Sequence, residues 1–334
     1  MKKIFRPNQS LGPYCEEISI IIQMNHRKAI IDLGTNTFQL LIVEQSGSNF
    51  KTLHEDQYAA KIGKGGISNG IITEEGIERA IIALQYFQPF FDKFEIRTEN
   101  ISATATSAVR NASNGAEFCE RILAATGINV EVISGDEEAG LIYDGVKLGT
   151  EIGKRPSMIM DIGGGSVEFI LCDEDRIFWK QSFEIGGQRL MDKFMFVDPI
   201  SPKSLSSMQN FLEEQLLPLT NAVHQYAPEV LIGSAGSFET LVDLHYHKLK
   251  GGFPEKELVS FDLPLSEFQD SFQKIMSLDR AGRMALPGMI ELRVDMIVVG
   301  VFLIQFVLKK YEIQDIKVST YALKEGVLSR SLAR

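Results

Sequence analysis

The sequence predicts an α/β fold made of two related domains that face each other across a cleft. The chain has 334 residues, 44% of them hydrophobic, and a single hydrophobic core seldom grows beyond about 250–300 residues. Strand and helix patterns alternate along most of the chain, which is typical of α/β domains. An internal repeat at residues 29–43 and 158–172 indicates that both domains share one plan.

The repeat aligns AIIDLGTNTFQLLIV with MIMDIGGGSVEFILC without gaps. Each copy has an apolar strand, an aspartate, a turn rich in Gly, Asn, Thr or Ser, and a second apolar strand. This is the pattern of a β-hairpin. The two turns are therefore the first candidates for a ligand site.

The remaining elements follow from hydrophobic periodicity and from turn residues. After the first hairpin we expect a strand near 50–62, a glycine-rich loop over 61–70, a helix over 73–94, a strand over 101–104, a helix over 115–126, a strand over 130–133 and a helix over 137–148. After the second hairpin we expect a strand over 176–183, a helix over 203–223, a strand over 230–232, a helix from 236, mainly helices over 264–310, a strand over 316–318 and a helix over 322–332.

Composition narrows the function classes. The net charge of −10 argues against a protein that coats nucleic acid through a broad basic face. Cys15, Cys119 and Cys172 lie far apart, which favours reduced thiols in the cytoplasm over a zinc site or a disulfide framework. The longest apolar run, near 296–308, is too short to span a bilayer. We expect a cytoplasmic protein that binds neither nucleic acid nor membrane.

The repeated turns are candidate phosphate clamps. Asp32 and Asp161 each end a strand, and turns without bulky side chains let backbone N–H groups reach phosphate oxygens. A single copy would be explained better by a hairpin turn whose aspartate caps its own backbone, but the duplication favours the clamp. A carboxylate beside phosphates indicates Mg²⁺. The clamp residues are Gly34, Thr35, Asn36 and Thr37 in the first turn and Gly163, Gly164, Gly165 and Ser166 in the second.

Glu168 aligns with Gln39 of the first copy, so this carboxylate is specific to the second hairpin. Alternation along the strand places it on the same side as Ser166. It could orient a metal-bound water. The spacing fits equally well with a polar residue on the solvent face of a hairpin.

Two further segments carry candidate catalytic residues. Residues 102–111 are rich in Ser and Thr, follow a strand and open a helix, so Arg110 is either a bidentate phosphate contact or a solvated surface arginine. Residues 132–140 read VISGDEEAG, and acids in a first helical turn often only complement the helix dipole. Their place between the clamps favours a carboxylate that accepts a proton from attacking water.

Residues 231–237, LIGSAGS, run from a strand into a glycine-rich turn and offer a weaker phosphate or nucleotide site through Gly233, Ser234, Gly236 and Ser237. His245 and His247 could ligate a metal. They lack a third ligand at a recognisable spacing, so a surface strand or helix explains them better.

Taken in order, the motifs DLGTNT, Arg110-Asn111, ISGDEEA, DIGGGSVE and GSAGS resemble those of the exopolyphosphatase and guanosine pentaphosphate phosphohydrolase family. Residues 286–300 are similar to the Arg-x-Asp segment of that family. The resemblance implies two ribonuclease H-like domains of the actin-like ATPase superfamily that flank a cleft, in the short form of the family. It implies an N-terminal extension over 1–25, a first domain of 26–135 plus 322–334, and a second domain of 136–321.

The resemblance also implies roles. Glu138 would be the base that activates water, Asp161 and Glu168 would hold Mg²⁺ or Mn²⁺, Asp32 would lie near the metal or the phosphates, and Arg110 would grip the phosphate chain. A monovalent cation can accompany the divalent ion. The turns at 34–37, 163–166 and 233–237 would bind phosphate. Lys324 stands where relatives commonly have Arg, and a lysine lacks the forked guanidinium that can bind phosphate through two hydrogen bonds. The resemblance also implies a homodimer.

The function implied is an exopolyphosphatase that releases orthophosphate from the end of linear inorganic polyphosphate. Hydrolysis of the 5′ γ-phosphate of guanosine pentaphosphate at the same site is the nearest alternative. A sugar or acid kinase is disfavoured by the pair of glutamates at 137–138. A sensor that binds phosphate compounds without turnover is disfavoured by the full set of Glu138, Asp161 and Glu168.

Overall fold

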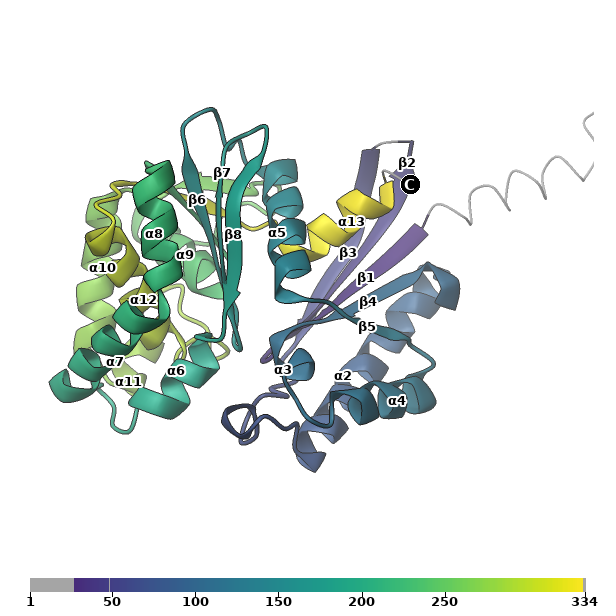
Figure 1. Cartoon of the computed structure of the whole chain (residues 1–334). Coiled ribbons are helices and arrows are strands. Elements are labelled where there is room, and N and C mark those ends of the chain that lie inside the picture. The colour runs from purple at the N-terminus through teal and green to yellow at the C-terminus, as the bar shows by residue number, and fades with distance from the viewer. Residues whose placement is uncertain (1–26, 48, 333–334) are drawn as a thin grey trace, which may run out of the picture.

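The computed structural model describes residues 27–47 and 49–332. The expected extension over 1–25 and Cys15 lie outside the described residues. The chain forms two lobes, each built on a mixed β-sheet with helices packed on its faces (Figure 1).

The first lobe holds a five-stranded sheet of order β3-β2-β1-β4-β5. Strands β1 to β3 form an antiparallel meander, and β4 and β5 run parallel to β1. One face packs under α2 and α4, with Ile31, Leu40 and Phe87 in that core. The elements are β1 (Arg27–Leu33), β2 (Phe38–Ser46), β3 (Asn49–Tyr58), η1 (Ile67–Asn69), α2 (Glu74–Lys93), η2 (Thr98–Asn100), β4 (Ile101–Ala105), α3 (Ser107–Arg110), α4 (Gly115–Thr126) and β5 (Val130–Val132).

The second lobe holds a six-stranded sheet of order β10-β11-β9-β6-β7-β8. One face packs under the lobe's own helices, with Met160 and Phe169 in the core, and the other face packs under α5. The elements are α5 (Gly135–Gly149), β6 (Ser157–Ile162), β7 (Val167–Cys172), β8 (Ile177–Phe183), α6 (Gly187–Phe194), α7 (Pro202–Gln215), α8 (Leu217–Tyr226), β9 (Val230–Ser234), α9 (Gly236–Lys250), β10 (Ser260–Asp262), α10 (Leu265–Ser277), α11 (Arg280–Met284), α12 (Ile297–Lys310) and β11 (Asp315–Ser319). Helix α13 (Leu323–Leu332) follows β11 and packs on the sheet of the first lobe.

The two sheets repeat one topology, which confirms the predicted fold class. In each lobe a central strand, β1 or β6, starts an antiparallel meander on one side and pairs with a parallel strand on the other. The register also repeats, because Asp32 lies opposite Gln39 and Asp161 lies opposite Glu168. The alignment of the two hairpins in sequence is therefore an alignment in space.

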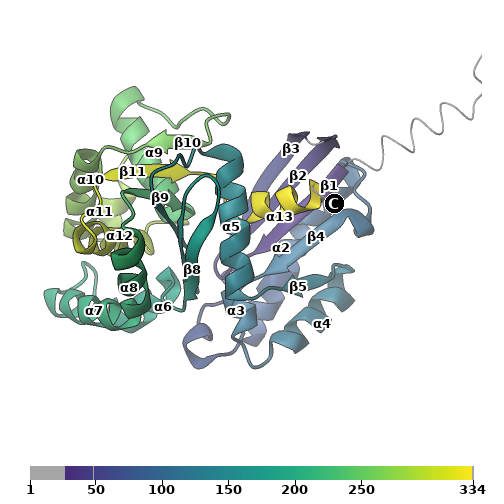
Figure 2. The ribbon, with the colours of Figure 1, turned by 45° about the horizontal axis from the view of Figure 1, so that its top comes forward.

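Helices α5 and α13 join the lobes (Figure 2). Helix α5 packs on β7 and β8, α13 packs on β1 and β2, and the two helices pack on each other. They cross where each has a glycine: a Cβ on Gly145 would overlap the carbonyl of Ala322, and a Cβ on Gly326 would overlap that of Leu141. Since both helices lie between the sheets, the expected domain limits at 135/136 and 321/322 stay a prediction.

Two local features differ from expectation. The helix expected over 203–223 is two helices, α7 and α8, which separate at Leu216. Pro218 follows in the first turn of α8, a position where the missing N–H of proline costs no hydrogen bond. Helix α5 begins two residues earlier than expected, at Gly135, because the side chain of Ser134 caps it by accepting from the Glu137 amide at 3.1 Å.

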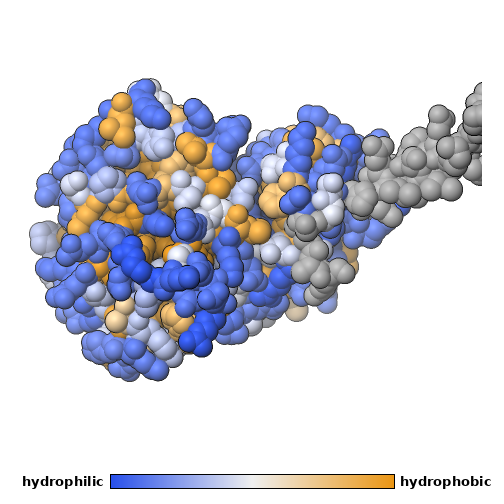
Figure 3. All heavy atoms as spheres, turned by 90° about the horizontal axis from the view of Figure 1, so that it is seen from above, coloured by the Kyte–Doolittle hydropathy of each residue, from blue (hydrophilic) through white to orange (hydrophobic). Residues whose placement is uncertain are grey.

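The outer surface is mostly hydrophilic on the face shown in Figure 3, and apolar residues gather there on the larger lobe. Within 27–47 and 49–332, no helix combines the length and the apolar character needed to cross a bilayer.

Candidate active site

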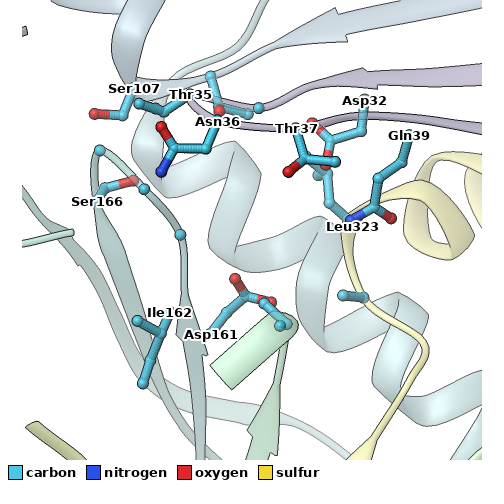
Figure 4. A pocket seen from close by; sticks show the side chains of 18 of the residues that line it. Asp32, Thr35, Asn36, Thr37, Gln39, Ser107, Asp161, Ile162, Ser166 and Leu323 are labelled. Atoms are coloured by element: carbon cyan, nitrogen blue, oxygen red, sulfur yellow. The ribbon is translucent and has the colours of Figure 1, made fainter. Parts of the chain in front are cut away.

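A cavity lies between the lobes at the ends of β1 and β6. Its volume is about 100 Å³, which is enough to hold several water molecules. Both hairpin turns contribute, as Figure 4 shows. The lining residues among the predicted site are Asp32, Gly34, Thr35, Asn36, Thr37, Glu138, Asp161, Gly163, Gly164, Gly165, Ser166 and Gly236.

The two turns approach each other so closely that side chains would not fit. A Cβ on Gly164 would lie 2.8 Å from Nδ2 of Asn36, and one on Gly165 would lie 2.6 Å from Oγ of Ser107. Both distances are shorter than real Cβ contacts allow. The glycines of the second turn are therefore needed for the first lobe to pack against it, besides leaving the backbone accessible to a ligand.

Asp32 and Asp161 extend from opposite lobes toward the same space (Figure 4). Asp161 accepts a hydrogen bond from Oγ of Ser234 at 2.6 Å, and Oδ1 of Asp32 is enclosed and has no hydrogen-bond partner among the described residues. Burial raises the pKa of Asp32 to about 7, and the charge of Asp161 adds to that shift. Burial also raises the pKa of Asp161 to about 6, against the hydrogen bond from Ser234.

Glu138 lines the same cavity from the first turn of α5, and only 6% of it is exposed. Its Oε2 accepts from Nη1 of Arg110 at 2.7 Å. Arg110 Nη1 also donates to the carbonyl of Ile133 at 3.2 Å. Burial raises the pKa of Glu138 to about 8, although Arg110 acts in the opposite direction. A carboxylate of this kind is suited to accept a proton near neutral pH.

Five predicted site residues do not line the cavity. Glu168 is 1% exposed and accepts from Oγ of Ser182 at 2.6 Å, and burial raises its pKa. Arg110 lies behind Glu138. In the third turn only Gly236 reaches the cavity, since Gly233 and Ser234 belong to β9 and Ser237 packs near Gly300. Ser234 contributes indirectly, through its hydrogen bond to Asp161.

The cavity also includes charged residues that sequence reasoning left out of the predicted site: Glu239, Arg293 and Lys324. Lys324 lies at the start of α13 with 13% of its side chain exposed, and its Nζ lies 2.6 Å from Oε1 of Glu325. Arg293 and Lys324 both belong to segments that resemble a known family, so the sequence held a reason to include them in the predicted site. Neither residue lies near a turn of the repeat in sequence, and only the fold brings them there.

The lining fits a divalent cation that also binds phosphate. Among the described residues there is no group of three His, Cys, Asp or Glu side chains arranged to hold a metal. Mg²⁺ usually takes one or two carboxylates and completes its shell with water and substrate phosphates. The enclosed, unpartnered Oδ1 of Asp32 and the facing Asp161 supply that donor set.

His245 and His247 lie on α9, away from this cavity. They line a separate pocket in which Nδ1 of His245 is 3.5 Å from Oε2 of Glu267. Within the part of the chain that the structure describes, they have no third metal-ligating side chain.

The model of the Ppx/GppA phosphatase family matches residues 41–334. The chain is similar to a crystal structure of an exopolyphosphatase from Cytophaga hutchinsonii, with 42% identity, a TM-score of 0.88, and coverage of 92% of this chain and 98% of that one. A Ppx/GppA protein from Aquifex aeolicus has the same fold at 24% identity, with a TM-score of 0.74 and coverage of 92% and 97%.

A curated relative is longer. The chain is 29% identical over 299 residues to the bifunctional 3-dehydroquinate synthase/phosphatase of Fusobacterium nucleatum. The match covers 85% of this chain but spans only 43% of the length of that protein.

Proposed function

The chain belongs to the Ppx/GppA phosphatase family, and we propose that it hydrolyses the terminal phosphoanhydride of linear inorganic polyphosphate. The observation that carries the proposal is the position of Glu138, a buried carboxylate held by Arg110 at a cavity formed by two glycine-rich turns. The small volume of the cavity suits the end of a substrate rather than a whole chain. The name of the Cytophaga protein supports the same substrate class.

In the proposed reaction, water attacks the terminal phosphorus while Glu138 accepts a proton from it. The P–O bond to the bridging oxygen breaks, and that oxygen leaves with the shortened chain. Orthophosphate is the other product. Residues of the turns at 34–37 and 163–166 line the cavity, and their backbone amides would stabilise charge on the oxygens of the transferred group without reorganisation during the reaction.

We propose Mg²⁺ as the cofactor, held by Asp32 and Asp161, with Mn²⁺ as a substitute. The ion would supply Lewis-acid stabilisation of phosphate oxygens. Glu168, predicted as a second metal ligand, is enclosed beside Ser182 and lies opposite Asp161 in the pairing of β6 with β7. A monovalent cation and a homodimer are proposed on the basis of the family resemblance alone, and sizing of the purified chain tests the homodimer.

Guanosine pentaphosphate is the second candidate substrate, because its 5′ end presents the same terminal phosphoanhydride. The two are separated by kcat/KM measured side by side on long-chain polyphosphate and on guanosine pentaphosphate, with Mg²⁺ and a phosphate-release assay. We expect polyphosphate to have the higher value. A higher value for the pentaphosphate would reverse the assignment, and release of phosphate from neither would leave a binding protein.

A further inference from the structure

A cluster of three hydrogen-bond donors surrounds the carboxylate of Glu184 at one edge of the cleft. Oγ of Ser107 donates to its Oε2 at 2.6 Å, Nη2 of Arg110 lies 3.4 Å from its Oε1, and Nη2 of Arg189 lies 3.1 Å from its Oε2. We call Ser107, Arg110 and Arg189 the donor cluster. It spans the cleft, because Ser107 and Arg110 belong to α3 of the first lobe and Arg189 belongs to α6 of the second.

The donor cluster keeps its geometry by contacts that do not involve Glu184. Arg110 is held through Nη1 by Glu138 and the carbonyl of Ile133. Arg189 donates from Nε to the carbonyl of Gly165 at 2.9 Å and from Nη1 to that of Ile67 at 3.1 Å. If Glu184 turned away, one N–H group of each guanidinium and the hydroxyl of Ser107 would still point at the position of its carboxylate.

Exposure separates the carboxylate from its donors. The side chain of Glu184 is 42% exposed, whereas those of Arg110 and Arg189 are 17% and 19% exposed. The carboxylate can therefore leave toward solvent while the arginines stay. Ser107 also lines the cavity between the two turns, so the position of the Glu184 carboxylate adjoins the proposed reaction site.

The charge of this edge contrasts with that of the other opening of the cleft. A groove of about 850 Å³ leads from the cavity past β3, and it is lined by four carboxylates, those of Glu55, Asp56, Glu239 and Glu257, against the two cations Lys256 and Lys324. At the donor cluster, two guanidinium groups contact two carboxylates, those of Glu184 and Glu138. When Glu184 turns away, two cations remain against the one carboxylate of Glu138, so an anionic ligand is favoured at the cluster and opposed at the groove.

We propose that Ser107, Arg110 and Arg189 form a binding subsite for a phosphate group, and that Glu184 occupies it as an internal competing anion when no ligand is bound. The identity of the phosphate group as substrate or product rests on the function proposed above. Arginine forks match the oxygens of phosphate as well as those of carboxylate, and a phosphate group brings more oxygens and more charge than the carboxylate that it displaces.

The test is direct binding of orthophosphate to the purified full chain by calorimetry, at fixed salt. Glu184→Gln removes the competing charge with little change of shape, and we expect it to bind orthophosphate roughly fivefold more tightly, which corresponds to about 1 kcal/mol. Arg189→Gln should weaken binding by about tenfold or more, as expected for the loss of a charge-assisted contact.

Asp192→Asn is the matched control. Asp192 lies on the same helix, α6, and accepts from Oγ of Ser68 across the same gap at 3.2 Å, but it lies outside the donor cluster. It should bind orthophosphate as the unchanged chain does. If Glu184→Gln bound orthophosphate no more tightly than Asp192→Asn, or if Arg189→Gln bound it normally, the cluster would only fasten the lobes and the proposal would be wrong.

A second titration with tripolyphosphate distinguishes the sources of the phosphate group. If the variants shift affinity for both ligands, the subsite takes the end of a chain. If the variants change the affinity for orthophosphate alone, the subsite binds the released product. These binding measurements require no turnover. If the chain proved inactive on polyphosphate, the proposed function would be wrong, but the same titrations could still confirm or contradict the subsite.

Discussion

Arg110 donates to Glu138 across 2.7 Å, so the predicted phosphate grip and the predicted base form one ion pair. Both side chains are largely enclosed, with 17% and 7% exposed. Arg110 favours the charged form of Glu138 in a site whose burial favours the neutral form, and burial remains the larger effect. It also means that substitution of either residue alters the other.

Glu138→Gln should abolish turnover while leaving substrate binding in place, because the amide keeps the shape of the side chain but cannot accept the proton. Loss of a general base typically costs about 10²- to 10⁴-fold in rate. Phosphate release measures the rate, and calorimetry with tripolyphosphate measures binding. The control is Glu137→Gln, since this neighbour is exposed and its ion pair, among the described residues, is with Arg330 at 3.6 Å. Near-normal turnover by Glu138→Gln would remove it from the base role.

The pH profile should report the same ion pair. The base must be deprotonated, and the pKa of Glu138 is raised to about 8 by burial while Arg110 lowers it. We expect kcat/KM to rise with pH on the acid side. Arg110→Met removes the group that lowers this pKa, so the midpoint of the rise should move to higher pH. An unchanged midpoint, at whatever reduced rate, would show that Arg110 does not set the protonation of the base.

Features of the fold and the site could be predicted where their residues lie close together in the sequence. The repeated hairpins, with Asp32 and Asp161 at equivalent positions, could be found because each lies within fifteen contiguous residues. Glu138 and Arg110 were identified separately by their turns, and their contact could not be inferred, since 28 residues separate them.

Other features depended on packing that no short pattern encodes. Lys324 reaches the cavity only because α13 returns to the first sheet, and Glu184 lies outside every motif although three donors converge on it. Glu168 was predicted to be at the metal or else on a solvent face. Its enclosure excludes the solvent face, because β8 pairs with β7 and brings Ser182 against it, and its role at the metal stays a prediction.

The stability of the metal-free chain should fall as pH rises. Asp32 and Asp161 have pKa values raised to about 7 and about 6, above those of an unfolded chain. The folded state therefore holds protons that the unfolded state releases from about pH 4 upward. The stabilisation is complete below pH 4 and is lost as pH rises through 6 and 7. Thermal unfolding in chelator should show Tm decreasing over this range, and Mg²⁺ should raise Tm again at pH 8.

Asp32→Asn tests the origin of that loss. The amide carries no charge to bury, so the variant should have a higher Tm than the unchanged chain in chelator at pH 8 and a smaller increase on addition of Mg²⁺. Asp92→Asn, on the exposed surface of α2, should follow the unchanged chain. A full Mg²⁺ response in Asp32→Asn would exclude Asp32 as a ligand.

The crossing of α5 and α13 should tolerate no side chain at Gly145. A Cβ there would overlap the backbone of α13, and backbone cannot move aside as a flexible side chain can. Gly145→Ala should cost about 1–3 kcal/mol or more of unfolding free energy, as overpacking does. Gly140→Ala in the same helix is the control, since its Cβ would meet only the tips of Arg330 and Lys180 at 3.0 and 3.1 Å. It should be neutral or stabilising, because alanine favours helix more than glycine. Equal losses in urea unfolding would contradict this account.

Lys324 should stabilise the chain by balancing a buried carboxylate. Its Nζ lies 2.6 Å from Oε1 of Glu325, a side chain only 1% exposed, and 3.8 Å from Oε1 of Glu55. Lys324→Met leaves Glu325 charged without its partner, which typically costs about 3–5 kcal/mol for a buried pair. The double variant Lys324→Met/Glu325→Gln should recover much of that loss, since a glutamine oxygen can still accept from the Ala322 amide, as Glu325 does at 2.8 Å. Urea unfolding of the single and double variants measures the coupling, and additive losses would mean that the ion pair does not account for the burial of Lys324.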